Sequence, residues 1–198
     1  MIIPSRWTVS AVALCVAAAG CTSAGVESNF NRVSERTALL STADLRQASD
    51  LSGVTGTATY DGIAAVNLPA PSAPIIYPAT ADVRLVADFD NASISGNLTN
   101  WTDMMPLSYE LRGSAAIFGG VIDPDAGEFT ASITGNVERR PIGAYNPLDP
   151  PVNYVFDGFA DGAFHDSVDG DPHSHVVGRI IAPLLNGGLV TGDYVARR

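Results

Sequence analysis

All three histidines of the chain and three of its aspartates lie in one stretch, residues 165–175 (HDSVDGDPHSH). Imidazole nitrogens are common ligands of Zn²⁺, and carboxylate oxygens at alternate positions can bind Ca²⁺. The spacing matches neither a zinc motif nor an EF-hand, and Asp-Gly-Asp-Pro is first of all a turn sequence. We therefore expect a solvated hairpin tip, with Ca²⁺ or Zn²⁺ binding as the alternative. The candidate metal ligands are His165, Asp166, Asp169, Asp171, His173 and His175.

The elements that position this stretch are predicted to be β-strands. From residue 53 onward, apolar and polar residues alternate with the period of two that is typical of strands, most clearly in residues 129–137 (FTASITGNV). The same alternation turns Phe164 and Val176 inward, so His165 and His175 are expected to point outward from neighbouring strands. The expected strands are residues 56–66, 82–89, 91–98, 108–118, 129–137, 154–165, 175–182 and 188–196.

One face of each expected strand is apolar and rich in glycine and alanine, and the other is polar or mixed. Small inward residues suit a sheet that closes on itself, and closure removes the sheet edges. Polar outer faces are the opposite of what a membrane-spanning barrel needs. We predict an all-β fold, a soluble eight-stranded antiparallel up-and-down barrel over residues 53–198. A two-sheet sandwich is the alternative.

The N-terminal region has a different composition. Residues 1–20 have the apolar run and small-residue ending of a secretory signal peptide. Residues 18–21 (AAGC) resemble a bacterial lipobox, in which Cys21 would carry the lipid, and Thr22 after it resembles an outer-membrane sorting signal. An ordinary cleaved signal is the alternative. Residues 21–52 are predicted to be a tether with a short helix. We expect a lipid-anchored outer-membrane protein that faces the periplasm or the cell surface.

Charge and composition exclude several classes of function. The net charge is −10 and no lysine is present, which argues against binding nucleic acid or docking on anionic lipid head groups. Cys15 falls in the signal peptide and Cys21 would carry lipid, so the mature chain has no thiol for a disulfide or a nucleophile. No nucleophile elbow, phosphate-binding loop or zinc-protease motif is present. We therefore expect a protein that is not an enzyme.

Alternate connections of an up-and-down barrel lie at the same end. Three of these connections, residues 68–81, 100–105 and 139–153, are expected to share one end, and they are rich in proline and in large apolar side chains. Such loops are typical of recognition surfaces. The alternative is that the side chains fold inward and plug the barrel. The candidate ligand-binding residues are Tyr77, Trp101, Met104, Met105 and Tyr145.

Several segments resemble the β-barrel domain of transferrin-binding protein B and related surface lipoproteins. They include residues 56–66 (GTATYDGIAAV), 83–98 (VRLVADFDNASISGNL), 127–137 (GEFTASITGNV) and 190–197 (VTGDYVAR). The resemblance implies a surface lipoprotein that binds a protein partner, with a role in iron acquisition. Haem, with a tyrosine or methionine of the loop residues as axial ligand, is the alternative ligand. A structural envelope protein without a ligand is the third hypothesis.

Overall fold

The structure, a computed structural model, describes residues 45–48, 50–70, 76–104, 109–141, 151–167, 170–185 and 187–198. The predicted signal peptide, Cys21 and most of the expected tether lie outside the described residues. Within the described ranges, no helix has the length and apolar character needed to cross a membrane.

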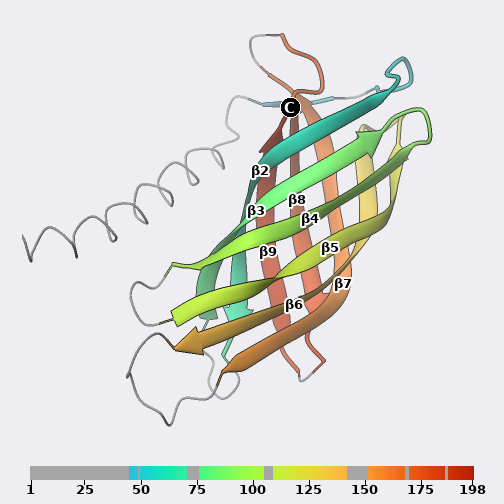
Figure 1. Ribbon diagram of the computed structural model, residues 1–198. Helices are drawn as coiled ribbons and strands as arrows, with labels where there is room; N and C mark the ends of the chain where they lie inside the picture. Colours follow the sequence, from blue (N-terminus) through green and yellow to red (C-terminus); the bar gives the residue numbers. More distant parts are fainter. Residues whose placement is uncertain are drawn as a thin grey trace, which may run out of the picture. The chain divides into compact units, whose positions relative to one another are not determined.

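The described part of the chain is all β-structure, and eight long strands close into an antiparallel barrel, as predicted (Figure 1). A strand of two residues, β1, lies beside β7. The bounds are β1 Arg46–Gln47, β2 Thr57–Pro69, β3 Ile76–Asp88, β4 Ser93–Asp103, β5 Tyr109–Asp123, β6 Glu128–Pro141, β7 Val152–Asp166, β8 His175–Pro183 and β9 Leu189–Arg197.

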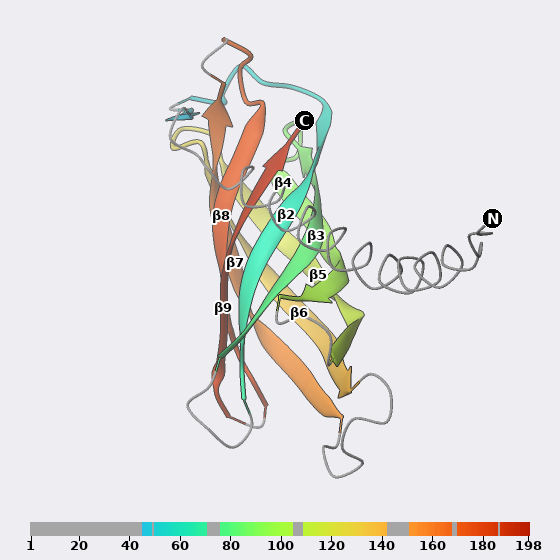
Figure 2. The ribbon, with the colours of Figure 1, turned by 90° about the vertical axis from the view of Figure 1, so that its left-hand side faces the viewer.

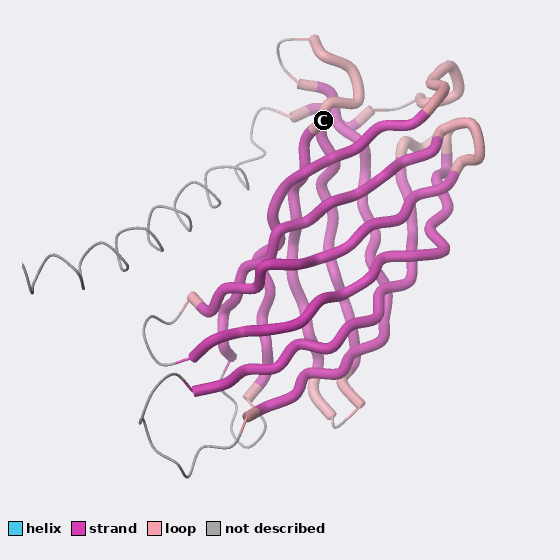
Figure 3. The backbone as a smooth tube through the Cα atoms, viewed as in Figure 1, coloured by secondary structure: helices cyan, strands magenta, loops and turns pink. Residues whose placement is uncertain are grey.

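Every barrel strand pairs with its neighbours in chain order, and pairing of β9 with β2 closes the ring. Figure 2 shows β8, β9 and β2 forming one wall of this barrel. Figure 3 shows that the strands are inclined across it, as closure of a sheet requires. The closed ring pairs backbone N–H and C=O groups that the edges of an open sheet would leave free.

The strands extend further than the alternation predicted. β2 and β3 stay paired as far as Pro69 and Ile76, so most of the loop expected at residues 68–81 is strand. Residues 101–103, also expected in a loop, belong to β4. The inward alternation continues through Tyr77, which packs against the core, and Pro69 and Pro78 pair with the neighbouring strand on either side of it.

Of the residues that precede the barrel, Arg46 and Gln47 form a short strand, and most of the tether in which a helix was predicted lies outside the described residues. In β1, Arg46 pairs with Asp166 of β7. This position lies beyond Ala163, the last residue of β7 that pairs with β6. The Ala48 N–H donates to the Phe164 carbonyl (2.8 Å), and Ala48 and Leu51 are buried. The chain is therefore fixed to this end of the barrel before the first long strand begins.

Inward positions carry the core, as the alternation predicted. The interior is packed with large rings, since Tyr60, Tyr154, Phe156, Phe164 and Tyr194 are all fully buried. Phe164 lies at the centre of one cluster. Its ring centroid is 5.8 Å from that of Tyr60, 5.5 Å from that of Phe89 and 5.9 Å from that of Phe129.

The outer face is mixed, in line with the prediction of a polar or mixed face, and carries some large apolar side chains. A β-bulge between Phe118 and Val121 inserts Gly119, which adopts a positive φ of 61°. The extra residue reverses the alternation, so Phe118 and Val121 both lie exposed on the outside. Phe159 is also exposed on the outer face of β7.

Glycines on neighbouring strands make room for one tyrosine. Gly162 and Gly178 face each other on β7 and β8, and the Tyr194 hydroxyl donates to the Asp161 carbonyl (3.0 Å). A Cβ added at Gly178 would lie 2.2 Å from the Asp161 oxygen and 2.3 Å from the Tyr194 hydroxyl. Strand pairing and ring packing therefore both require glycine at this position.

We expect Gly178→Ala to lower the free energy of unfolding by about 1–3 kcal/mol, because the methyl group must displace backbone or the buried ring. Urea denaturation measures the change. Gly53→Ala is the matched control, since nothing lies within 4 Å of its added Cβ. Equal stability of the two variants would contradict the close packing described above.

Candidate functional site

We call one end of the barrel the loop end, where β2, β4, β6 and β8 finish and β3, β5, β7 and β9 begin. Its interior holds a buried ion pair. Arg139 Nε lies 2.9 Å from Asp103 Oδ2, and the two side chains are only 4% and 3% exposed. The guanidinium carbon lies 3.8 Å from the ring centroid of Tyr77 and 3.3 Å from that of Tyr109. Two aromatic rings and a carboxylate thus hold one cation across β3, β4, β5 and β6.

A β-bulge explains how Asp103 reaches the interior. Continuing the alternation beyond Leu98 would turn Trp101 and Asp103 outward. The pairing of β3 with β4 shifts between Thr80 and Asp82, and Asn100 adopts a positive φ of 51°. This extra residue turns both side chains inward. The sequence signal was an asparagine in an otherwise regular strand, which alternation alone does not identify.

Within the described ranges, two hydrogen-bond donors on strands of the loop end are buried without a partner. They are Trp101 Nε1 and the Tyr154 hydroxyl. Burial raises the pKa of Tyr154 to about 12, Arg139 opposes this rise, and Tyr77 and Asp103 add to it. The tyrosine therefore remains a neutral donor at physiological pH.

The predicted ligand-binding residues separate into two groups. Tyr77 and Trp101 lie on the inner wall, where Trp101 is buried and packs edge-on against Phe156. Met104 follows β4 and is partly buried. The other two, Met105 and Tyr145, lie outside the described residues. For Tyr77 and Trp101 the structure corresponds to the alternative in which these side chains fill the barrel mouth.

Different side chains give the outside of the loop end its apolar character. Ile76 at the start of β3 is 58% exposed, Leu189 at the start of β9 is 47% exposed, and Leu185 after β8 is 79% exposed. Ile76 pairs with Pro69, and Leu189 pairs with Pro183. We call these five residues the apolar rim. Ile76 falls in the connection 68–81, which was expected to carry large apolar side chains, whereas Leu185 lies in a connection with no predicted role and Leu189 at the start of the last expected strand.

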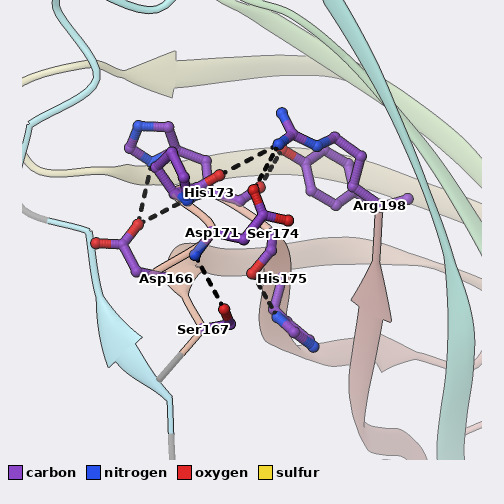
Figure 4. Close-up of polar contacts among 9 residues, drawn as sticks. Asp166, Ser167, Asp171, His173, Ser174, His175 and Arg198 are labelled. Atoms are coloured by element: carbon purple, nitrogen blue, oxygen red, sulfur yellow. Dashed lines mark hydrogen bonds and ion pairs between the residues drawn. The ribbon is translucent and has the colours of Figure 1, made fainter. Parts of the chain in front are cut away.

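We call the opposite end of the barrel the hairpin end. Here the loop between β7 and β8 is held by polar contacts (Figure 4). Asp166 Oδ1 accepts from the backbone N–H of His173 (2.8 Å) and lies 3.5 Å from its Nδ1 atom. Arg198 at the C-terminus lies 3.1 Å from Asp171. The Tyr60 hydroxyl, inside the barrel, donates to the His173 carbonyl (2.9 Å). The predicted hairpin tip is thus tied to the barrel.

The other two histidines form a separate pair. His165 and His175 lie directly opposite each other on β7 and β8, as the alternation predicted. Burial lowers the pKa of His165, and the neighbouring His175 lowers it further, while Asp166 opposes the shift. Burial and Arg197 lower the pKa of His175, and Asp171 opposes this.

The predicted metal ligands do not converge on one point. Among the described residues, no group of three or more histidine, cysteine, aspartate or glutamate side chains is arranged to hold a metal ion. Asp169 lies outside the described residues. Asp166 and Asp171 are occupied by hydrogen bonds and an ion pair within the hairpin, as a structural turn requires.

An acidic groove of about 980 Å³ runs over the outer surface of the barrel. Its lining includes the carboxylates of Asp123, Glu128, Asp161 and Asp193. Arg179 also lines the groove and is bound to Asp161, with Nη2 2.8 Å from the carboxylate. The groove therefore has the electrostatic character of a cation-attracting surface.

Comparisons with known proteins give no family for this chain. No family model matches it, and no match is found among curated proteins or solved structures.

Breaking the buried ion pair tests its structural role. We expect Asp103→Asn to lower the free energy of unfolding by about 3–5 kcal/mol, because it leaves the buried Arg139 without a counter-charge. Combining Asp103→Leu with Arg139→Met should restore most of the loss, measured by urea denaturation. Asp61→Asn is the control, since the Asp61–Arg84 pair is exposed. A double variant that is less stable than Asp103→Asn would contradict this account.

The histidine pair predicts a pH dependence of stability. The folded pKa values lie below the ordinary value near 6.5, so the unfolded state binds protons first as the pH falls. The free energy of unfolding should therefore decrease from about pH 7 downward. Replacing both His165 and His175 by Asn should make that decrease shallower. Equal slopes for the wild type and the double variant, in urea denaturation across this range, would contradict the prediction.

Proposed function

We propose that the chain is a lipid-anchored outer-membrane lipoprotein whose barrel binds a protein partner through the loop end. The observation that carries this proposal is the apolar rim. Isolated exposed apolar residues are ordinary on protein surfaces, but a group of them at one end of a barrel is typical of an interaction site. The resemblance to transferrin-binding protein B supports an iron-carrying protein as the partner.

Rigidity beneath the rim favours recognition. The rim follows the ends of β2, β3, β8 and β9, and the neighbouring ends of β3 to β6 are joined inside by the Arg139–Asp103 pair. A contact surface that is already ordered loses less conformational entropy when a partner binds. The ion pair would therefore support binding without touching the partner.

The path of the chain agrees with this orientation. β1 and the buried residues Ala48 and Leu51 fix the incoming chain at the hairpin end. A tether that starts from a lipid on Cys21 would thus reach the barrel at the end opposite the rim. The rim would then face away from the membrane, where a partner can approach.

The barrel interior offers less support for haem or another small ligand. The inner wall is filled by buried rings, and Tyr77 stacks on Arg139. Using Tyr77 as an axial ligand would require breaking that stack. A protein partner that contacts the outside of the loop end requires no such rearrangement.

Biolayer interferometry with immobilised transferrin, iron-loaded or iron-free, tests the proposal. We expect Ile76→Asp and Leu185→Asp each to weaken binding at least about tenfold, which corresponds to about 1.4 kcal/mol. Val86→Asp is the control, because Val86 is exposed near the other end of β3. Unchanged binding by the rim variants would exclude the rim. No binding by the wild-type protein would exclude transferrin as the partner.

A haem titration followed by absorbance tests the alternative hypothesis that the chain binds haem. A saturable Soret band that is lost in Tyr77→Phe would favour the haem-binding hypothesis over a protein partner. A flat titration would leave the protein partner as the remaining hypothesis of the two.

A further inference from the structure

We propose that His165 and His175 form a two-nitrogen clamp for one divalent transition-metal ion, and that Cu²⁺ is the ion bound most tightly. The two imidazoles lie on the outer face of the barrel at the hairpin end. This site is independent of the apolar rim at the opposite end, so either proposal can fail without affecting the other.

Strand pairing positions the two rings. His165 and His175 are register partners on adjacent antiparallel strands, and such partners have Cβ atoms about 4.5–5.5 Å apart on the same face of the sheet. Their neighbours Phe164 and Val176 are buried, which holds both histidines on the outside. Ligands carried by paired strands are better ordered than ligands on a loop, so little ordering remains to be done when a metal binds.

Each ring keeps one nitrogen for a metal ion. In His175, Nδ1 lies 2.8 Å from the Ser174 hydroxyl. This contact orients the ring and leaves Nε2 free to bind a metal ion. In His165, Nδ1 is buried without a hydrogen-bond partner, so Nε2 is the nitrogen available from the solvent side. Two Nε2 atoms on neighbouring strands are thus available to one ion.

The electrostatic surroundings allow the rings to act as ligands. Metal binding requires unprotonated imidazole, and burial keeps the pKa of both rings below the ordinary value. Asp166 and Asp171 add negative charge near the pair. Arg197, the register partner of His175 on β9, opposes metal binding, and Arg198 offsets part of the charge of Asp171.

The number of ligands determines the kind of metal site. No third histidine, cysteine or carboxylate among the described residues completes it, so water or an atom of another molecule must fill the remaining positions. Two imidazoles with open positions suit Cu²⁺, Ni²⁺ and Zn²⁺. Cu²⁺ binds most tightly in the ordinary order of divalent metals, and it is therefore the probe to use.

Electron paramagnetic resonance of the full chain, purified without a polyhistidine tag and titrated with Cu²⁺, tests the clamp. We expect one bound ion per chain, with hyperfine coupling to two imidazole nitrogens. His165→Asn and His175→Asn should each abolish the two-nitrogen signal. Circular dichroism of each variant verifies that the barrel remains folded.

His173→Asn is the matched control, because His173 lies in the same hairpin but outside the pair. Its φ is +53°, a conformation that asparagine tolerates, so the backbone should be retained. This variant should keep the two-nitrogen signal. Loss of the signal in His173→Asn, its persistence when both His165 and His175 are replaced, or no binding by the wild type at equimolar Cu²⁺ would each overturn the proposal.

Discussion

Closure of the sheet is the constraint on which the rest of the structure depends. Once β9 pairs with β2, every inward side chain must share one narrow interior, and glycines leave space for large rings such as those of Tyr194 and Phe156. Tyr194 lies against Gly162 and Gly178 for this reason. The same crowding leaves the protein little internal volume for a ligand. Binding sites are therefore expected at the two ends and on the outer face.

The two ends of the barrel cover the core in different ways. At the hairpin end, β1, Ala48 and Leu51 cover the core with backbone hydrogen bonds and apolar side chains. At the loop end, the buried Arg139–Asp103 ion pair covers the core instead. Arg139 is acceptable in the interior only because Asp103 and two tyrosine rings surround it. At the loop end, polar groups thus lie inside the barrel and apolar side chains lie outside it. This is the reverse of the usual distribution of polar and apolar residues in a protein.

Alternation of residue types was sufficient to predict the barrel, the inward rings and the opposition of His165 and His175. It failed where a single residue changes the register. Asn100 and Gly119 each insert a bulge that reverses the faces of the residues after it, and neither is evident from composition. Pairing of Arg139 with Asp103 depends on contacts between strands far apart in the sequence, which no local pattern encodes. Metal binding was the alternative to a hairpin tip, and among the described candidate ligands His165 lies opposite His175 while Asp166 contacts His173, so they form no single site.

The two-residue pairing of β1 has a mechanical consequence. A force applied to the chain at residue 45 acts first on the contacts of Arg46 and Gln47 with β7, because β7 is held much more extensively by its pairing with β6 and β8. Those few hydrogen bonds break before any barrel strand is loaded. Each residue released adds about 3.3–3.6 Å of extended chain. The short pairing of β1 therefore yields first under strain, while the barrel keeps its shape.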